Sequence, residues 1–447
     1  MSPNRGHYPT IVSPHTGSSG CRLPRIMVPA PKHHRDCVDE EAFPLMSLQE
    51  LLEWKEPKSG GGVRRLFQPR ASPSSQPLTL VCHDMKGGYL DDRFVSGCSN
   101  KDAYRFYHWS GVDTFVYFSH HLVTIPPPAW INAAHLHGVS VLGTFITEWE
   151  AGSAVCKDLL ASEGTVETAV NQLTRIAHYH GFEGWLVNIE NEVPPAKIPL
   201  LLYFLRKLTS AMRTTDANRK MEEKIMKEEE TRKESKEIEK KLTEDETNME
   251  RKEVNELYGK SHNIHRVIWY DSVTENGKLE WQNELNPHNQ AFFNACDGIF
   301  LNYTWTEAHL DRTKKAAAAT GSGFEGDRIS DVFVGLDIFG RNFYAGGKYN
   351  TWKALDVVRK YGLSAAIFAP GWTFETQDNF VEAEKCMWRS LAPYLNHQGP
   401  QHLPLTTSFC QGYGDHFYCR GKVEKEGAWH DLSLQQLQPL WSQIFTV

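Results

Sequence analysis

The sequence of 447 residues lacks the signatures of several large protein classes. It contains no run of about 18 apolar residues, so no segment is predicted to span a membrane. Residues 1–31 lack the apolar core of a secretory signal. The nine Cys form no C-x-x-C pair, which favours reduced, buried thiols and a cytosolic or nuclear setting. A formal net charge of -7 gives no electrostatic argument for binding nucleic acid or an anionic membrane.

Several motifs of cofactor and nucleophile chemistry are also missing. Gly60-Gly61-Gly62 lies in a linker, and Gly346-Gly347 is not followed by Lys and Ser or Thr, so no phosphate loop is predicted. No Gly-x-Ser-x-Gly elbow occurs. His120-His121 has no second His at the helical spacing of a zinc motif, and His residues at strand ends more often form hydrogen-bonding pockets. We therefore predict neither a metal nor a cofactor.

What the sequence does contain is an alternation of short apolar runs with longer amphipathic segments. Eight such alternations favour an α/β fold of the (β/α)8 TIM-barrel type over an open doubly wound sheet. The predicted helices include 130–137, 165–180, 198–213, 286–295 and 351–361. The predicted strands are 78–85, 113–121, 139–149, 184–192, 266–273, 298–305, 331–340 and 364–372.

Composition divides the chain around this barrel, which we predict over residues 77–398. Residues 1–76 are expected to be largely disordered, with one short helix in 43–54 that Ser47 caps. A segment rich in Glu and Lys, 216–256, is predicted as an insertion, either a solvated helix or disordered, on the barrel face away from the chemistry. Residues 399–447 are predicted to be a partial β-rich region, like the start of a β-sandwich that looks truncated.

Polar and aromatic residues gather where the predicted strands end. In such a barrel the active site lies at the C-terminal ends of the strands, so this pattern predicts one functional face. Several Trp side chains near that face, out of thirteen in the chain, could stack on sugar rings, although packing at the rim is the alternative for each. The strand-end residues are His83-Asp84, Ser119-His120, Glu148-Trp149, Asn188, Glu190, Tyr270-Asp271, Asn302, Trp305, Asp337 and Trp372.

The fourth predicted strand, within 184–192, places an amide and a carboxylate on one face. Asn188 and Glu190 are two residues apart, so their Cα atoms are about 6.5 Å apart and their side chains point the same way. A strand end followed by an ordinary polar loop is the alternative interpretation. The opposite face of the strand comprises Trp185, Val187 and Ile189.

One acid beside an amide, on a barrel with aromatic platforms, suggests glycoside hydrolysis. The usual mechanism requires two carboxylates across the scissile bond, but here the second position is an amide. That suits a 2-acetamido sugar, whose own carbonyl oxygen attacks the anomeric carbon to form an oxazoline. Asn188 would orient the acetamido N–H, and Glu190 would protonate the leaving oxygen and later deprotonate water.

The strand-end motifs also resemble a known family. The segments HDMKGGYLDDRF (83–94), FVYFSHHLVTIPP (115–127), VLGTFITEWEAG (141–152), GWLVNIENE (184–192), WYDSV (269–273), LNYTW (301–305) and FAPGW (368–372) are similar to the cytosolic endo-β-N-acetylglucosaminidases of glycoside hydrolase family 85. The resemblance runs from about residue 47 to 439, interrupted by the insertion. It implies cleavage of the chitobiose core of N-glycans, leaving one N-acetylglucosamine, with transglycosylation in some members.

The resemblance also implies roles for individual residues. Asn188 would be the oxazoline-orienting amide, Glu190 the general acid/base, Tyr270 a hydrogen-bonding group near the acetamido moiety, and Trp281 an aromatic residue on the acceptor side. The expected partners are N-glycans, glycopeptides and free oligosaccharides in the cytosol. A catalytically silent glycan-binding barrel is the alternative function. The candidate substrate-binding residues are Phe118, His120, Glu148, Trp149, Asp271, Trp281, Asn302, Trp305, Asp337 and Trp372.

Overall fold

The protein is described here from a computed structural model. The structure describes residues 41–57, 63, 66, 76–213, 266–320, 328–400, 405–419 and 421–438. All of these residues belong to one compact unit, Asp39–Val447. Residues 1–40 and the predicted insertion at 216–256 lie outside the described part of the chain. Among the described helices, none has both the length and the hydropathy needed to cross a membrane.

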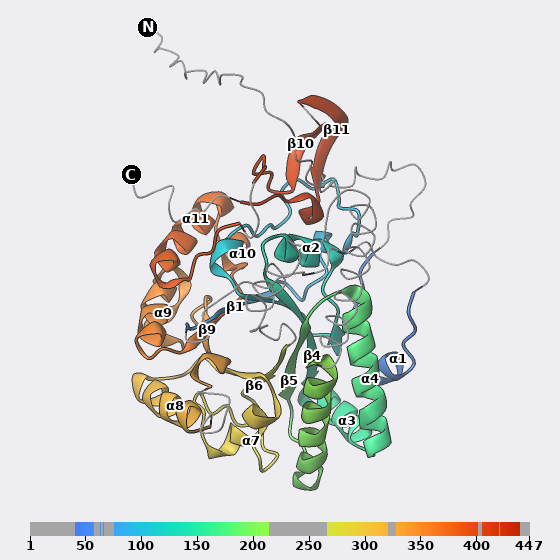
Figure 1. Ribbon diagram of the computed structural model, residues 1–447, viewed down its shortest axis with the longest axis vertical. Coiled ribbons are helices and arrows are strands. Elements are labelled where there is room, and N and C mark those ends of the chain that lie inside the picture. Colours follow the sequence, from blue (N-terminus) through green and yellow to red (C-terminus); the bar gives the residue numbers. More distant parts are fainter. Residues whose placement is uncertain are drawn as a thin grey trace, which may run out of the picture. The chain divides into compact units, whose positions relative to one another are not determined.

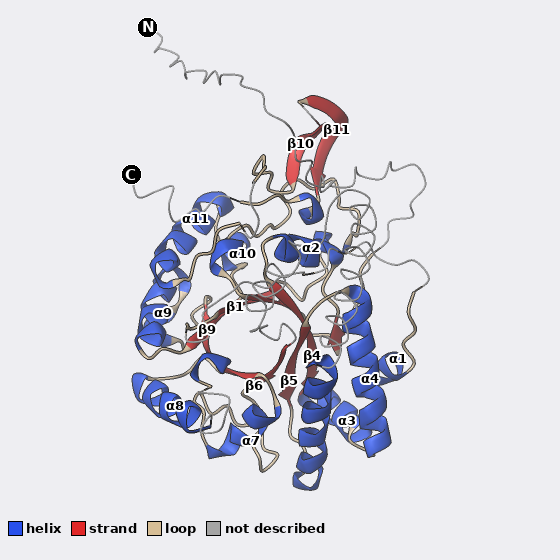
Figure 2. Cartoon of the chain, viewed as in Figure 1, coloured by secondary structure: helices blue, strands red, loops and turns tan. Residues whose placement is uncertain are grey.

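Parallel strands close into a barrel surrounded by helices, which confirms the predicted (β/α)8 fold (Figures 1 and 2). The nine-stranded sheet consists of eight parallel strands and the short β3 (Val123–Thr124), which pairs antiparallel with β4. A pairing between β2 and β4 closes the ring. The parallel strands are β1 (Thr79–Asp84), β2 (Thr114–Phe118), β4 (Ser140–Glu148), β5 (Gly184–Glu190), β6 (Arg266–Tyr270), β7 (Gly298–Leu301), β8 (Val332–Asp337) and β9 (Ser364–Phe368).

The helices follow the strands, and each predicted helix is present with ends shifted by a few residues. Ser47 caps α1 as predicted, because its hydroxyl accepts the backbone N–H of Glu50 at 3.2 Å, although the helix is shorter than expected. Residues 198–213 are also helical. The remaining helices are α1 (Leu48–Leu52), α2 (Pro128–Leu136), α3 (Trp149–Leu159), α4 (Glu163–His180), α7 (Pro287–Ala295), α8 (Glu307–Thr320), α9 (Thr351–Lys360), α10 (Trp372–Thr376) and α11 (Phe380–Leu391).

Two apolar layers follow from the alternation of side chains along the strands. The barrel interior is filled by a separate cluster that includes Leu142, Leu186, Ile268 and Phe333. The layer between strands and helices contains the other face of β5, as the sequence predicts: Trp185, Val187 and Ile189. Asn188 and Glu190 therefore share the interior face with Leu186, at the end of the strand where the apolar filling stops.

Three carboxylates form hydrogen bonds at the end of the barrel where the strands begin. Each of three acidic residues immediately precedes one strand and accepts a backbone N–H from the start of the adjacent strand. These hydrogen bonds fix the relative register of neighbouring strands. They lie at the end of the barrel opposite to the C-terminal face, so they involve no side chain of that face. The pairs are Thr79 to Asp113 at 2.8 Å, Val141 to Glu183 at 2.8 Å, and Val267 to Asp297 at 2.7 Å.

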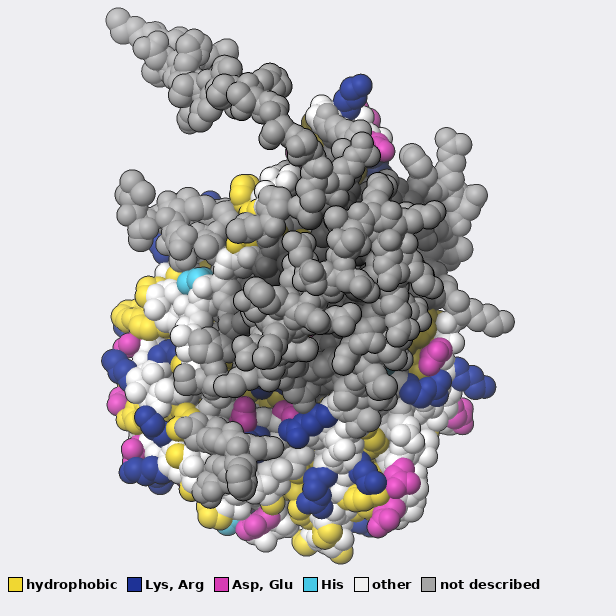
Figure 3. All heavy atoms as spheres, viewed as in Figure 1, with side chains coloured by type: hydrophobic (Ala, Val, Ile, Leu, Met, Phe, Trp, Pro, Cys, Tyr) yellow, Lys and Arg dark blue, Asp and Glu magenta, His cyan; other side chains and the backbone are white. Residues whose placement is uncertain are grey.

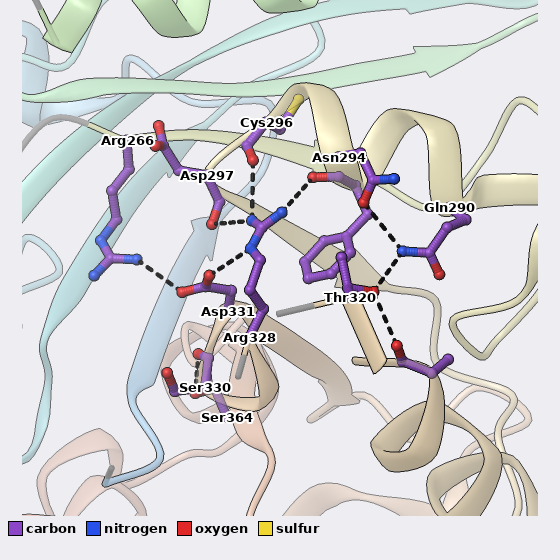
Figure 4. Close-up of polar contacts among 12 residues, drawn as sticks. Arg266, Gln290, Asn294, Cys296, Asp297, Thr320, Arg328, Ser330, Asp331 and Ser364 are labelled. Atoms are coloured by element: carbon purple, nitrogen blue, oxygen red, sulfur yellow. Dashed lines mark hydrogen bonds and ion pairs between the residues drawn. The ribbon is translucent and has the colours of Figure 1, made fainter. Parts of the chain in front are cut away.

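Arg328 ties the loops together at the same end (Figure 4). Its guanidinium donates to the carbonyl oxygens of Phe293 and Asp297 at 3.0 and 2.9 Å and to the Asp331 carboxylate at 2.9 Å. Arg213, the last described residue before the gap that contains the insertion, donates from Nε to Asp297 at 2.9 Å. The residues that flank this gap, 213 and 266, thus lie where the strands begin.

The predicted β-rich C-terminal region contains one antiparallel hairpin, β10 (Tyr413–Cys419) and β11 (Lys422–His430). Gln435, which follows it, accepts from Trp109 Nε1 at 2.6 Å and donates to the Phe106 carbonyl at 2.9 Å. These buried contacts attach the region to the barrel. That the hairpin begins a β-sandwich stays a prediction.

The outer helices carry charges of both signs. On the face drawn in Figure 3, Lys and Arg side chains lie among Asp and Glu over the described outer surface. Pairs at i,i+4 spacing, such as Lys315 with Asp311 and Lys360 with Asp356, each 2.6 Å apart, are exposed and contribute little to stability.

A buried carboxyl group joins the two helices that follow β9. Glu384 of α11 is fully buried and accepts from the Thr373 hydroxyl of α10 at 2.5 Å, and its other oxygen lies 3.8 Å from His108 Nε2. Burial raises the pKa of Glu384 to about 8, although Thr373, Trp388 and Arg105 oppose the shift, and burial lowers the pKa of His108. Both groups are therefore neutral at pH 7.

This buried acid predicts a pH dependence of stability. Between its ordinary value of 4.5 and about 8, the folded state holds a proton that the unfolded state has lost. Stability should therefore fall as pH rises through this window, by up to about 1.4 kcal/mol per pH unit. Urea unfolding at pH 5, 6, 7 and 8 measures the slope. Glu384→Gln, which cannot titrate, should flatten it, whereas Glu382→Gln on the exposed face of α11 should not. An unchanged slope in Glu384→Gln would contradict the assignment.

Candidate active site

The register of two adjacent strands brings the central residues together. In the β4–β5 ladder Asn188 pairs with Ile146, and Glu190 pairs with Glu148. All four side chains point into the barrel because they share the parity of Leu186. The C-terminal end of β5 therefore carries an amide and a carboxyl group, with a second carboxyl group beside it on β4.

Asn188 and Glu190 form a direct hydrogen bond. Asn188 Nδ2 donates to Glu190 Oε1 at 2.8 Å, and Asn188 is 3% exposed. The amide presents its N–H to Glu190 and its oxygen to the other side. That oxygen, Oδ1, is buried and has no hydrogen-bond partner among the described residues. Such an unsatisfied buried acceptor suits a ligand that brings its own donor.

The environment of Glu190 raises its pKa above the ordinary value of a Glu side chain. Burial is the main reason that its pKa is raised; the Asn188 hydrogen bond lowers the pKa, the Glu148 charge raises it, and the His120 charge lowers it. A carboxylic acid with a raised pKa can donate a proton near neutral pH and then act as a base.

His120 lies beside Glu148. Its Nδ1 is 3.1 Å from Oε1 and 3.0 Å from Oε2 of that carboxylate. The hydrogen bond to Glu148 is the main cause of a raised pKa for His120. Both residues therefore lie at the C-terminal ends of strands, as predicted.

Tyr270 occupies the equivalent position on β6. Its hydroxyl donates to Asn302 Oδ1 at 2.9 Å, and Asn302 Nδ2 donates to Asn283 Oδ1 at 2.8 Å. Burial, with the nearby Glu190 and Asp271 charges, raises the pKa of Tyr270 well above its ordinary value, so the phenol stays protonated. The strand end therefore presents a neutral, oriented hydroxyl next to the Asn188–Glu190 pair.

Asp271 is not placed to bind substrate, which corrects the prediction. It is 1% exposed, and its oxygens accept from the backbone N–H of Asn283 at 2.7 Å and from Asn289 Nδ2 at 3.0 Å. Because Asp271 has the opposite parity to Tyr270, its side chain leaves the barrel and holds the loop that supplies Asn283. It positions the partners of Tyr270 instead.

Asp337 is likewise a supporting residue rather than a free ligand. It is 1% exposed and accepts from Arg341 through Nε at 3.0 Å and through the backbone N–H at 3.0 Å. Arg341 lies 6.0 Å from the ring of Phe368 and lowers the pKa of Asp84, whose pKa is raised mainly by burial. Arg341 was not predicted, because its contact with Asp337 depends on the turn that follows β8.

The predicted aromatic platforms divide into two groups. Trp149 and Trp281 are 62% and 37% exposed and remain available for stacking. Trp305 and Trp372 are 3% and 4% exposed, so both rings are packed within the protein. Trp305 donates to the Gly335 carbonyl at 2.8 Å and stacks on Tyr344. A role for these two residues in binding substrate stays a prediction.

Phe118 and Tyr303 line the barrel interior between the polar groups. Phe118 is 6% exposed, with its ring 5.4 Å from His120 and 6.0 Å from Phe368. Tyr303 lies 5.2 Å from Phe368 and 6.4 Å from Tyr270. Tyr303 was missed as a candidate, although it directly follows Asn302 in the LNYTW segment.

The chemistry of this face is that of an acid and an amide. Among the described residues, no group of three or more His, Cys, Asp or Glu is placed to hold a metal ion. The arrangement supplies one proton donor and acceptor, one unpaired amide oxygen and one phenol.

Comparison with known proteins gives a consistent result. The profile of the family described as Glycosyl hydrolase family 85 matches residues 89–417. A protein named cytosolic endo-beta-N-acetylglucosaminidase from Gallus gallus is 42% identical over 425 residues, covering 93% of this chain and 51% of the relative. The protein of that name from Homo sapiens is 40% identical over 424 residues, covering 93% and 50%. The chain thus spans about half the length of these curated relatives.

A solved structure shares the fold. The glycoside hydrolase domain of Endo-D from Streptococcus pneumoniae R6 superposes with a TM-score of 0.64 at 20% identity, covering 90% of this chain and 62% of that one. At this identity the likeness concerns the barrel architecture alone.

The supporting role of Asp271 predicts a contrast within one loop. Asp271→Ala leaves two donors without their acceptor, which should lower the free energy of unfolding by about 1–3 kcal/mol. Trp281→Ala, at an exposed position, should change it by less than about 0.5 kcal/mol. Urea unfolding followed by circular dichroism measures both. Equal, small effects would show that Asp271 does not hold the loop.

Proposed function

The chain belongs to glycosyl hydrolase family 85, and we propose that it is an endo-β-N-acetylglucosaminidase acting on N-glycans. The bond cleaved would join the two N-acetylglucosamine residues of the chitobiose core, leaving one on the acceptor. The observation that supports this chemistry is the Asn188 amide beside Glu190, whose buried oxygen is left for a substrate donor. The second carboxyl group of the site, Glu148, is instead hydrogen-bonded to His120.

In the first step Glu190 acts as the general acid. Its proton passes to the glycosidic oxygen as the bond from that oxygen to the anomeric carbon breaks. The carbonyl oxygen of the substrate's 2-acetamido group forms the new bond to that carbon and closes a protonated oxazoline (oxazolinium) ring, in which the nitrogen keeps its hydrogen. Asn188 Oδ1, unpartnered among the described residues, accepts the acetamido N–H as positive charge develops on it.

In the second step Glu190, now a carboxylate, takes a proton from water. The oxygen of that water attacks the anomeric carbon and the oxazoline ring opens, which regenerates the acetamido group with net retention of configuration. A sugar hydroxyl in place of water would give transglycosylation. Tyr270, oriented by Asn302, would hydrogen-bond near the acetamido group during both steps.

Substrate binding is proposed to involve the remaining accessible groups of this face. Trp149 and Trp281 would stack on sugar rings, and Phe118, His120, Glu148 and Asn302 would line the site. Trp149 has a φ of 54°, in the left-handed region that a bulky residue rarely adopts, and such strain is typical of functional positions. The substrates would be glycopeptides, glycoproteins and free oligosaccharides.

We propose the cytosol as the place of action. The relatives from Gallus gallus and Homo sapiens are named cytosolic, and the described cysteines are all free. We also propose that residues 77–398 form the catalytic barrel, and that 1–76, the insertion 216–256 and 399–447 lie outside its chemistry.

A catalytically silent glycan-binding barrel is the competing function. Such a protein would need exposed Trp rings but not a buried acid with a raised pKa beside an amide oxygen held ready for a donor. The Asn188–Glu190 pair therefore favours an enzyme.

The first test is cleavage of a defined glycopeptide, followed by mass spectrometry. The product should be the peptide with one N-acetylglucosamine. Glu190→Gln keeps the shape of the side chain but cannot donate a proton, so turnover should fall by about 10²–10⁴-fold or more while glycan binding persists. Glu192→Gln, beyond the strand end, is the matched control and should stay active. Near-normal turnover of Glu190→Gln would move the acid role to Glu192 or Glu148.

A second test separates substrate assistance from a covalent mechanism. Asn188→Ala should slow glycopeptide hydrolysis by about 3–4 kcal/mol in activation free energy, as for a lost oxyanion-type contact. Transfer from a preformed glycan oxazoline to an N-acetylglucosamine acceptor should be much less affected, because that substrate has passed the step Asn188 assists. Equal losses in both assays would make Asn188 only structural, and a trapped ester between sugar and enzyme would exclude the mechanism.

A further inference from the structure

Two carboxyl groups face each other across neighbouring strands at the centre of the site. Glu148 and Glu190 are register partners in the β4–β5 ladder, and adjacent strands are about 4.8 Å apart. Both side chains point into the barrel. Like charges at this separation resist simultaneous ionisation, so the charge of one carboxylate disfavours loss of the proton from the other.

His120 neutralises the second carboxylate from one side. Its Nδ1 lies 3.1 and 3.0 Å from the two Glu148 oxygens, whereas Glu190 takes its own hydrogen bond from Asn188. The edge-to-face contact with Phe118, at 5.4 Å between ring centres, limits the positions of the imidazole. The imidazole and its carboxyl partner are thus held next to Glu190, and neither is directly bonded to it in the described structure.

We propose that His120 and Glu148 form a charge pair that sets the protonation of Glu190, and that both act as positioning residues for the reaction. This inference rests on the proposed function. Before the first step the Glu148 charge helps Glu190 keep its proton. After the proton has left, the His120 cation stabilises the carboxylate that must activate water. The pair thus allows one residue to serve as acid and then as base.

Other polar and titratable groups lie at the same face of the barrel. None of them is substituted in the variants below, although His120 and Glu148 also act on the pKa of Asp84. The groups comprise Asp84 on β1, Asn188 on β5, Tyr270 on β6, Tyr303 after β7, and Asp337 with Arg341 at and after β8.

The test is the pH dependence of kcat/KM for glycopeptide hydrolysis. Its alkaline limb reports loss of the proton from Glu190 in the free enzyme. His120→Gln removes the imidazole, so the limb should move to higher pH by about one unit. Glu148→Gln removes the like charge, so the limb should move to lower pH. This second shift should be smaller, because His120 loses the hydrogen bond that is the main cause of its raised pKa. The double variant should return the limb toward that of the wild type.

Matched controls are available within the chain. His416 and Glu426 form a similar pair, 2.8 Å apart, on the β10–β11 hairpin, so His416→Gln and Glu426→Gln should leave the limb unmoved. Glu148→Asp keeps the charge and should keep the limb within about 0.3 units of the wild type if the carboxylate acts through its field. This variant also serves if Glu148→Gln does not fold.

The outcomes distinguish this inference from the function on which it rests. Wild-type protein that does not cleave the glycopeptide would refute the proposed function. Cleavage with opposite shifts in the two single variants supports the charge pair. Shifts in the same direction, or a rise in KM with an unmoved limb, would overturn it and leave the pair only as a sugar-binding group.

Discussion

The hydrogen bond from Asn188 to Glu190 is the interaction on which the account of this site depends. It joins two side chains that share one face of one strand, at 2.8 Å. Because the amide N–H is committed to the carboxyl group, the amide oxygen is turned away from it and has no partner in the described structure. The same contact lowers the pKa of a carboxyl group whose pKa is raised by burial. This one hydrogen bond therefore affects both the orientation of the Asn188 amide and the pKa of Glu190.

The rest of the barrel holds that pair in place. The polar contacts that stabilise the barrel itself lie at the other end of the strands. Asp113, Glu183 and Asp297 use their carboxylates at the ends where strands begin. The interior between the two ends is filled with apolar side chains, which exclude water from beneath Glu190. The contacts that stabilise the barrel and the residues proposed for catalysis thus lie at opposite ends of the same strands, as is usual for this fold. The flanks of the charged insertion lie at the stabilising end.

The sequence pattern correctly predicted the side-chain directions that follow from the two-residue period of a strand. It did not predict the contacts that side chains make in the turns beyond the strand ends. Alternation along β5 correctly placed Asn188 and Glu190 inward, because the period of two is a property of extended backbone. Asp271 and Asp337 were expected to face a substrate, but each accepts hydrogen bonds from the loop that follows its strand. The parity of Asp271, opposite to that of Tyr270, could have indicated its outward direction, whereas the contact of Asp337 depends on the turn after β8. Trp372 lies four residues beyond the end of β9, inside α10, where its ring is buried. Arg341 was overlooked because its position depends on the turn after β8.

The central claim is that the Asn188 oxygen is reserved for the acetamido group while Glu190 handles the proton. The most direct measurement is a crystal structure of the chain with a stable thiazoline analogue of the oxazoline. The ring nitrogen, in its protonated form, should lie about 3 Å from Asn188 Oδ1 and donate its N–H to that oxygen, with Glu190 placed to contact the water or acceptor oxygen on the open face of the anomeric carbon. A ring nitrogen pointing away from Asn188, with a carboxylate placed to attack the anomeric carbon, would contradict that claim.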